Sequence, residues 1–430
     1  MKWFSPTIYA LLLIAFIHFY FFPTDFSFSS KQNISFNNQI IINPSPPQQG
    51  NTYSFPINIR NLSVNDGDTT CDYSEGIWVR GKKGPLYNGT SCNTIKDGQN
   101  CISHGRSDQD YLYYRWKPEQ CKLSRFDPVV FLEILKNKHL AFVGDSMARN
   151  QLESLMCMLA IMSKPDLVYK DGEENKFRKW YFPSYNASVS IYWSPFLVKG
   201  VEKKGGLKNN LLYLDTVNER WGNDLVQMDI IVLSVGHWFL HPAVYYVGDT
   251  VLGCHFCPGQ NYTEIGFYDV FRKALNTTLK TILERKGPKK SGTFDVFVTT
   301  FSPHHFEGEW DKFGACPKTV PYKVGEKELQ GMDAEIRNFE VEEVNLAKVE
   351  ISKRGYSDNL RLEALDVTKL SFLRPDGHPG PYMYPNPFAN GITERVQNDC
   401  VHWCLPGAID TWNEILLDLL KKWHRKNSKK

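Results

Sequence analysis

Four short segments rich in apolar residues, each followed by a longer segment of helical character, constrain the fold of this chain more than any other feature. The first two, at 139–143 and 229–233, are nearly continuous apolar runs, which are typical of strands that are buried on both faces. We expect strands at 139–143, 229–233, 294–299 and 360–365, and helices at 147–162, 267–284, 327–353 and 408–423. Strands that alternate with helices predict an α/β fold with a mostly parallel sheet and helices on both of its faces.

The residues before these runs differ in composition. An apolar run from Trp3 to Phe22 follows Lys2, and about 20 residues are enough to span a bilayer as a helix. The run ends in bulky aromatic residues, whereas a cleaved signal peptide ends in small ones. We therefore expect residues 1–22 to form a cytosolic tip and an uncleaved signal anchor, with the rest of the chain in the lumen.

Residues 23–68 are rich in Ser, Asn, Gln and Pro, which predicts a flexible luminal stem. The luminal domain then covers 69–430. Within it we expect a disulfide-rich, loop-dominated N-terminal part at 69–125 and the α/β core at 126–424.

Cysteines and glycosylation sequons both favour a luminal location. Four of the ten cysteines fall between residues 71 and 121, which indicates disulfide bonds formed in an oxidising compartment. The segment Cys254-His255-Phe256-Cys257 is either half of a zinc site or a short disulfide loop, and the lack of a second ligand pair favours the loop. The sequons predict glycosylation at Asn33, Asn61, Asn88, Asn186, Asn261 and Asn276.

The charge of the chain argues against nucleic acid as a partner. The 50 basic and 47 acidic residues leave a formal net charge of only +3. A field of that size does not attract a polyanion.

Gly144-Asp145-Ser146 lies between the first expected strand and the helix that follows it. In open α/β sheets, sites form at the carboxyl ends of strands, where a helix N-terminus presents free N–H groups. A serine there can attack a carbonyl while those groups stabilise the oxyanion. The alternative is that Asp145 or Ser146 only caps the helix.

A nucleophilic serine needs a base, and the base needs an orienting carboxylate. His402 lies three residues after Asp399, so one tight turn can place the carboxylate against the imidazole. Cys400 and Cys404 flank His402, and disulfides from them would hold the turn rigidly. We therefore expect Ser146, His402 and Asp399 to form the catalytic triad.

Two other histidine segments compete with this assignment. Asp376-Gly377-His378 is surrounded by glycine and proline, which favours a structural turn that shapes the cleft. His304 and His305 are adjacent after the third expected strand, so their side chains point apart.

Three more residues fall near the expected site. His237 follows the second expected strand, where it either lines the substrate cleft or packs under Trp238. The N–H of Gly236 is a candidate oxyanion donor. Arg149 lies one helical turn after Ser146, where it either contacts substrate or pairs with a carboxylate.

Three motifs together resemble the plant trichome birefringence-like family. They are the segment from Cys71 to Val79, the segment from Val143 to Gln151 that contains Gly-Asp-Ser, and Asp399-x-x-His402. The resemblance covers about residues 70–424. It implies a three-layer α/β/α fold of the SGNH/GDSL esterase type and a polysaccharide O-acetyltransferase of the Golgi, with Ser146 as nucleophile, His402 as base and Asp399 as its partner.

The resemblance also implies disulfide bonds, with Cys254–Cys257 as a local addition: Cys71–Cys121, Cys92–Cys157, Cys101–Cys404 and Cys316–Cys400. One segment departs from the wider SGNH pattern, because Ser234-Val235-Gly236-His237 stands where the hydrolases have an asparagine. The segments Gly253–Cys257 and Thr300–Gly308 look most like the xyloglucan-acetylating branch.

The expected function is therefore acetyl transfer to a hemicellulose hydroxyl, with xyloglucan as the favoured acceptor and xylan or mannan as alternatives. No bound cofactor is expected, but an acetyl donor is needed, either acetyl-coenzyme A or a donor derived from it. The expected partners are the glycan, the Golgi membrane and a membrane protein that supplies the donor. The competing functions are a glycan acetylesterase, which uses the same triad with water, and a non-catalytic wall-polysaccharide-binding protein.

Overall fold

A seven-stranded mixed sheet organises the part of the chain that the computed structural model describes, residues 71–173, 176–204, 207–288, 292–391 and 395–428. Its strand order is β13-β12-β9-β3-β6-β5-β4. The first five of these strands run parallel, and β5 and β4 continue the sheet in antiparallel pairing. The strands are β3 (His139–Gly144), β4 (Asp166–Asp171), β5 (Phe177–Phe182), β6 (Ala187–Trp193), β9 (Ile230–Ser234), β12 (Phe294–Thr299) and β13 (Leu360–Leu365).

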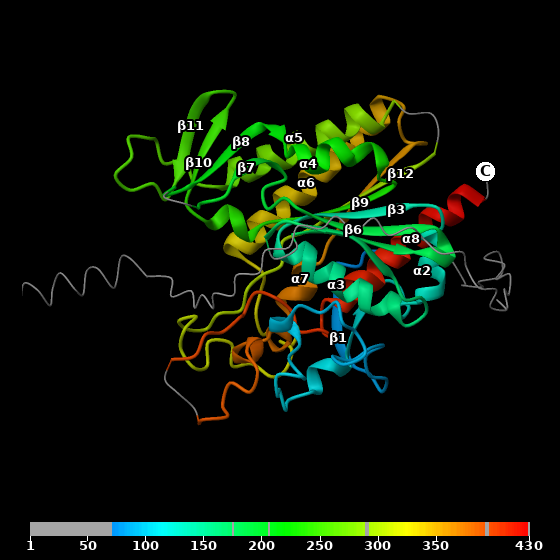
Figure 1. Ribbon diagram of the computed structural model, residues 1–430, viewed down its shortest axis with the longest axis vertical. Coiled ribbons are helices and arrows are strands. Elements are labelled where there is room, and N and C mark those ends of the chain that lie inside the picture. The colour runs from blue at the N-terminus through cyan, green and yellow to red at the C-terminus, as the bar shows by residue number, and fades with distance from the viewer. Residues whose placement is uncertain (1–70, 174–175, 205–206, 289–291, 392–394, 429–430) are drawn as a thin grey trace, which may run out of the picture. The chain divides into compact units, whose positions relative to one another are not determined.

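Helices cover both faces of this sheet, which confirms the predicted three-layer α/β/α fold (Figure 1). One layer holds α2 (Pro128–Leu135), α3 (Ser146–Ala160) and α8 (Asp410–Ser428). The other holds α4 (Glu219–Asp224), α5 (Tyr268–Lys286) and α6 (Gly331–Lys353), and a short helix α7 spans Thr368–Phe372. The four predicted strands are β3, β9, β12 and β13, and the four predicted helices are α3, α5, α6 and α8.

Strand β3 shows that the centre of the sheet is buried on both faces. Successive side chains of a strand point to opposite faces, so Leu140 and Phe142 join the core under α3 and α8. Ala141 and Val143 join the other core under α5 and α6. A strand with two buried faces must be apolar throughout, which is the pattern that the sequence shows.

The described residues also form two smaller sheets. A four-stranded sheet beside α5 has the order β11-β10-β8-β7, which the sequence did not predict. Its strands are β7 (Val198–Val201), β8 (Asn210–Val217), β10 (Ala243–Val247) and β11 (Thr250–His255), and the antiparallel pair β1 (Gly76–Arg80) and β2 (Tyr114–Pro118) lies in the N-terminal part. Short 3₁₀ helices span Asp97–Gln99, Asp110–Tyr113, Pro183–Tyr185, Leu225–Gln227, His237–Leu240, Pro375–Gly377 and Pro381–Met383.

The N-terminal part is attached to the core by covalent bonds. All ten cysteines are paired, and the pairs are those that the family resemblance implies. Two of the bonds join the N-terminal part to α3 and to the segment before α8. The five bonds are Cys71–Cys121, Cys92–Cys157, Cys101–Cys404, Cys254–Cys257 and Cys316–Cys400.

The expected anchor at 1–22, the expected stem at 23–68 and the sequons at Asn33 and Asn61 lie outside the described residues. Within the described ranges, no helix combines the length and the apolar character that a membrane crossing requires.

Candidate active site

Ser146 begins helix α3, and only Asp145 separates it from the end of strand β3. The turn between them passes close to the end of β9, because Asp145 N–H donates to the carbonyl oxygen of Ser234 over 3.1 Å. A Cβ atom on Gly144 would lie 1.8 Å from that same oxygen, so only glycine fits there. Ser146 thus lies at the carboxyl end of a central strand and at a helix N-terminus, where backbone N–H groups are free.

Asp145 is the N-cap of α3. Its Oδ1 accepts a hydrogen bond from Met147 N–H over 2.9 Å, and the side chain is completely buried. Burial raises the pKa of Asp145 to about 6, while the N–H groups of Met147 and Gly236 and the imidazole of His402 oppose this rise. Capping is therefore the role of Asp145, and Ser146 itself remains available for chemistry.

Asp399 holds the imidazole of His402 in a defined tautomer. Nδ1–H of His402 donates to Asp399 Oδ2 over 2.7 Å. The other oxygen, Oδ1, accepts from the backbone N–H groups of His402 (2.9 Å) and Val401 (3.0 Å). Burial alone would raise the pKa of Asp399, but the charge of His402 and these hydrogen bonds hold it well below its usual value.

The free nitrogen of His402 is Nε2. It is buried and has no hydrogen-bond partner among the described residues, so Ser146 and His402 are not hydrogen-bonded here. A general base requires an imidazole nitrogen that is not already engaged, and hydrogen bonds between a base and its nucleophile often tighten only when substrate binds.

Asn150 joins the helix of Ser146 to the loop of His402. The side chain is fully buried one helical turn after Ser146. Its Oδ1 accepts from Trp403 N–H over 2.8 Å, and its Nδ2 donates to the carbonyl of the same residue over 3.2 Å. Nδ2 also donates to Oε1 of Gln99 over 3.1 Å. The peptide that follows His402 is thus fixed against α3.

The sequence did not single out Asn150 or Gln99. The spacing of four residues from Ser146, which places Asn150 on the same side of α3, is the one signal that could have found it. Gln99 gave no such signal, because it comes from the N-terminal part, some fifty residues earlier in the chain.

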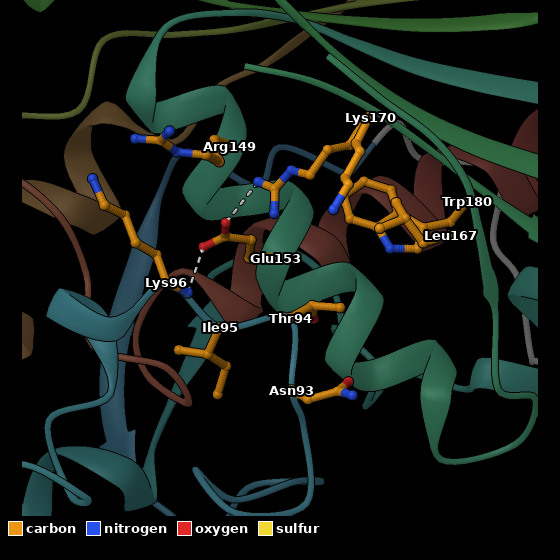
Figure 2. Close-up of a pocket in the computed structure, with 10 residues that line it drawn as sticks. Asn93, Thr94, Ile95, Lys96, Arg149, Glu153, Leu167, Lys170 and Trp180 are labelled. Atoms are coloured by element: carbon orange, nitrogen blue, oxygen red, sulfur yellow. Dashed lines mark hydrogen bonds and ion pairs between the residues drawn. The ribbon is translucent and has the colours of Figure 1, made fainter. Parts of the chain in front are cut away.

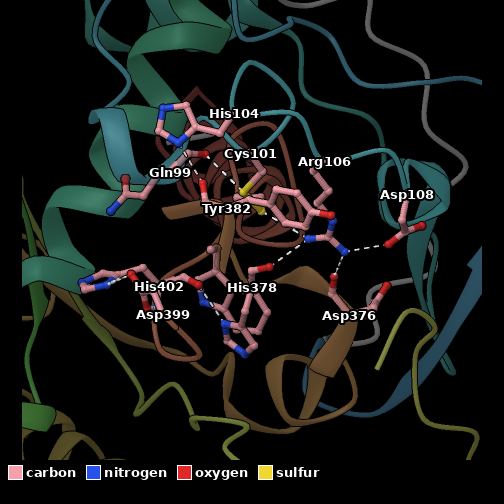
Figure 3. The surroundings of a disulfide bond; sticks show 12 residues. Gln99, Cys101, His104, Arg106, Asp108, Asp376, His378, Tyr382, Asp399 and His402 are labelled. Carbon is pink, nitrogen blue, oxygen red and sulfur yellow. Dashed lines mark hydrogen bonds and ion pairs between the residues drawn. A yellow bond between two sulfur atoms is a disulfide. The ribbon is translucent and has the colours of Figure 1, made fainter. Parts of the chain in front are cut away.

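Disulfide bonds anchor both sides of the Asp399–His402 turn, through Cys316–Cys400 and Cys101–Cys404. Arg106 adds a further support (Figure 3). Its guanidinium donates to the backbone carbonyls of His378 (2.8 Å) and Asp376 (2.7 Å).

The rival pair Asp376 and His378 supports the turn and is not part of a triad. Asp376 forms a fully buried ion pair with Arg374 over 2.8 Å. His378 Nδ1–H donates to the backbone carbonyl of His402 over 2.7 Å, and its other ring nitrogen contacts His305. Burial lowers the pKa of His305 to about 4. His304 is exposed and His305 is buried, so the two rings do not act together.

His237 is a neutral histidine near the site. Its Nε2–H donates to the carbonyl of Ser302 over 2.8 Å, and the ring packs against Phe301 with centroids 4.7 Å apart. Burial lowers its pKa to about 4. The N–H of Gly236 opposes the rise in the pKa of Asp145, and its role as an oxyanion donor stays a prediction.

Arg149 is buried, with 5% of its surface exposed. Its Nε has no hydrogen-bond partner among the described residues, and the guanidinium lies 5.6 Å from the ring centroid of Trp193. Of the two roles that the sequence left open, this geometry disfavours pairing with a carboxylate.

The candidate zinc motif holds no thiolate. Ligand atoms of Cys254, Cys257 and Glu264 lie within 4.8 Å of one another, but the two sulfur atoms are joined in a disulfide. The segment is therefore the short loop that the sequence favoured.

A three-layer α/β/α fold with a serine at the end of a parallel strand, and an Asp–His pair on the loop before the last helix, defines the SGNH class of acyl-ester enzymes. The chain belongs to the GDSL/SGNH-like acyl-esterase family found in Pmr5 and Cas1p, which matches residues 123–419. The PMR5 N-terminal domain matches residues 69–122.

Curated relatives cover most of the chain. It is 68% identical over 357 residues to xyloglucan O-acetyltransferase 1 of Populus trichocarpa, covering 83% of this chain and 82% of that protein. It is 58% identical over 354 residues to xyloglucan O-acetyltransferase 1 of Arabidopsis thaliana, covering 82% and 81%. Protein trichome birefringence-like 25 of Arabidopsis thaliana is 41% identical over 373 residues, covering 85% and 80%.

Proposed function

We propose that this protein is an O-acetyltransferase that acetylates a hydroxyl group of xyloglucan through an acetyl-serine at Ser146. The observation that carries the proposal is the Asp399–His402 pair, in which Nε2 of His402 has no partner among the described residues. Asn150 fixes the loop of His402 to helix α3, which Ser146 begins. The names of the two relatives above support xyloglucan as the acceptor.

In the first step, Nε2 of His402 takes the proton of Ser146 as Oγ bonds to the acetyl carbonyl carbon. The bond between that carbon and the leaving group of the donor breaks, and the leaving group receives the proton from His402. Asp399 remains ionised and stabilises the imidazolium that forms in between. N–H groups at the start of α3 stabilise the oxyanion.

In the second step, a sugar hydroxyl attacks the acetyl-serine. Its proton passes to His402 and then to Oγ of Ser146 as the ester bond to the serine breaks. Transfer outruns hydrolysis when the glycan is positioned and water is excluded. A glycan acetylesterase would use the same residues with water as acceptor, and a binding protein would use neither step.

An acceptor panel tests the proposal. The protein is incubated with an acetyl donor and with oligosaccharides of xyloglucan, xylan or mannan, and acetyl groups on each glycan are counted by mass spectrometry. We expect acetylated xyloglucan and none with Ser146→Ala. Loss of acetyl groups from pre-acetylated xyloglucan, without any gain, would indicate an esterase instead.

We further propose that residues 3–22 anchor the chain in the Golgi membrane with residues 69–430 in the lumen. The apolar run, the five disulfides and exposed sequon asparagines at Asn88, Asn186, Asn261 and Asn276 support this placement. Glycosidase treatment of the protein from plant membranes should shift its mobility on a gel. An unshifted protein would contradict a luminal domain.

A further inference from the structure

A pocket of about 440 Å³ lies beside the active-site helix (Figure 2). This volume is within the range of small-molecule sites. Ser146, Arg149 and Glu153 follow one another at helical spacing along α3, and the last two line the pocket. Its other lining residues come from the N-terminal part and from strands β4 and β5: Asn93, Thr94, Ile95, Lys96, Leu167, Lys170, Arg178 and Trp180.

The pocket is strongly basic. Four basic side chains and one acidic side chain line it, although the chain as a whole is almost neutral. The carboxylate of the acidic residue already has two partners. Glu153 forms an ion pair with Arg178 over 3.0 Å and accepts a hydrogen bond from Lys96 N–H over 3.1 Å. Its charge therefore does not compensate Arg149 or the side chains of Lys96 and Lys170.

Arg149 has an unpaired donor beside this pocket. Its side chain is more than nine-tenths buried, yet its Nε has no hydrogen-bond partner within the described ranges. Leaving a buried donor unpaired is costly. Figure 2 shows the guanidinium of Arg149 and the ammonium group of Lys96 on the same side of the pocket. An anion between them would satisfy both groups, and a guanidinium binds phosphate with two parallel hydrogen bonds.

A neutral glycan carries no charge that would balance these basic groups, whereas the phosphate groups of an acetyl donor would balance them. We propose that this pocket binds the phosphate groups of the acetyl donor, with Arg149 and Lys96 as the principal contacts. The inference rests on the proposed acetyl transfer, since Arg149 lies one helical turn from Ser146. Phosphate groups held there keep the donor beside the nucleophile and leave the sheet edge to the acceptor.

Two donors that differ in charge test the inference. The rate of Ser146 acetylation is measured by intact-mass spectrometry on the full chain, with acetyl-coenzyme A and with uncharged 4-nitrophenyl acetate. The variant is Lys96→Ala combined with Lys170→Ala, because both side chains are exposed and dispensable for packing. The control is Lys164→Ala, an exposed lysine after α3 that does not line the pocket.

We expect the double variant to acetylate at least tenfold more slowly with acetyl-coenzyme A and within twofold of the unchanged protein with 4-nitrophenyl acetate. Lys164→Ala should change neither rate by more than twofold. Equal effects of the double variant on both donors, or no effect on either, would overturn the inference.

A binding measurement separates this inference from the proposed function. Pyrophosphate is titrated calorimetrically into the full chain carrying Ser146→Ala. Binding that the double variant weakens at least tenfold supports the pocket even if no donor acetylates Ser146, which would then refute only the proposed function. Absence of pyrophosphate binding would refute the pocket alone.

Discussion

Replacing Asn150 with Ala tests how the active site is held together. The change removes three hydrogen bonds, two to the peptide groups of Trp403 and one to Gln99, and leaves their buried partners unpaired. Each unpaired buried group costs about 1–3 kcal/mol, and the losses are not additive. We therefore expect a loss of about 3 kcal/mol in the free energy of unfolding.

Asn150→Ala should also slow catalysis in the chain that remains folded. Trp403 follows His402 directly, so its release lets the imidazole move relative to Ser146. A displacement of about 1 Å lowers a rate by roughly 100-fold. The rate of Ser146 acetylation by 4-nitrophenyl acetate measures this effect, and urea unfolding measures the stability.

Asn413 provides a matched control. It is also fully buried and makes three hydrogen bonds with α3, to the carbonyl and amide of Gln151 and to Ser154, but none of them reaches the loop of His402. Asn413→Ala should lose similar stability and keep an acetylation rate within about threefold, far from the 100-fold loss expected of Asn150→Ala. Equal rates for the two variants would refute the positioning role of Asn150.

Three further predictions concern the active site and the strand that leads to it. Asp399→Asn should lower the acetylation rate on the order of 10³–10⁴-fold by removing the acceptor that orients His402, and a loss below tenfold in a stopped-flow assay would argue against the triad. The Cys316–Cys400 bond closes a loop of 84 residues. Serine substitution of both cysteines should lower the free energy of unfolding, measured in urea, by about 4 kcal/mol. An unchanged unfolding midpoint would contradict this. Burial lowers the pKa of His139 from 6.5 to about 4. Between these two pH values the unfolded chain binds more protons at this residue than the folded chain does. The free energy of unfolding therefore rises with pH from 4 to 6.5. His139→Gln should therefore reduce the gain in unfolding free energy between pH 4 and 7 by up to about 3 kcal/mol, and an unaltered pH dependence would show that His139 is not the titrating group.

The sequence predicted β3, β9 and β12 because these strands are buried throughout and are therefore largely apolar, whereas β13, at the end of the sheet, is buried only in part. The sequence did not predict β4, whose six residues are all exposed, or the sheet formed by β7, β8, β10 and β11. Strands such as β4, which is exposed, and β8, which is buried mainly on one face, leave a mixed pattern that is hard to tell from a loop.

The pairing of Asp399 with His402 was predictable because both residues lie on one short turn. The contribution of Asn150 and Gln99 was not, since their partners are distant in sequence and depend on the fold. The unpaired Arg149 and the basic pocket are also visible only in three dimensions, because Lys96, Lys170 and Arg178 come from separate segments.

The fate of a single acetyl group tests the central claim most directly. The full chain is acetylated at Ser146 with isotopically labelled donor, excess donor is removed, and xyloglucan oligosaccharide is added. We predict that the label leaves the serine and is recovered as an ester on the glycan, with no labelled glycan from Ser146→Ala. Label that remains on the serine, or labelled glycan made by the Ser146→Ala variant, would contradict an acetyl-serine intermediate.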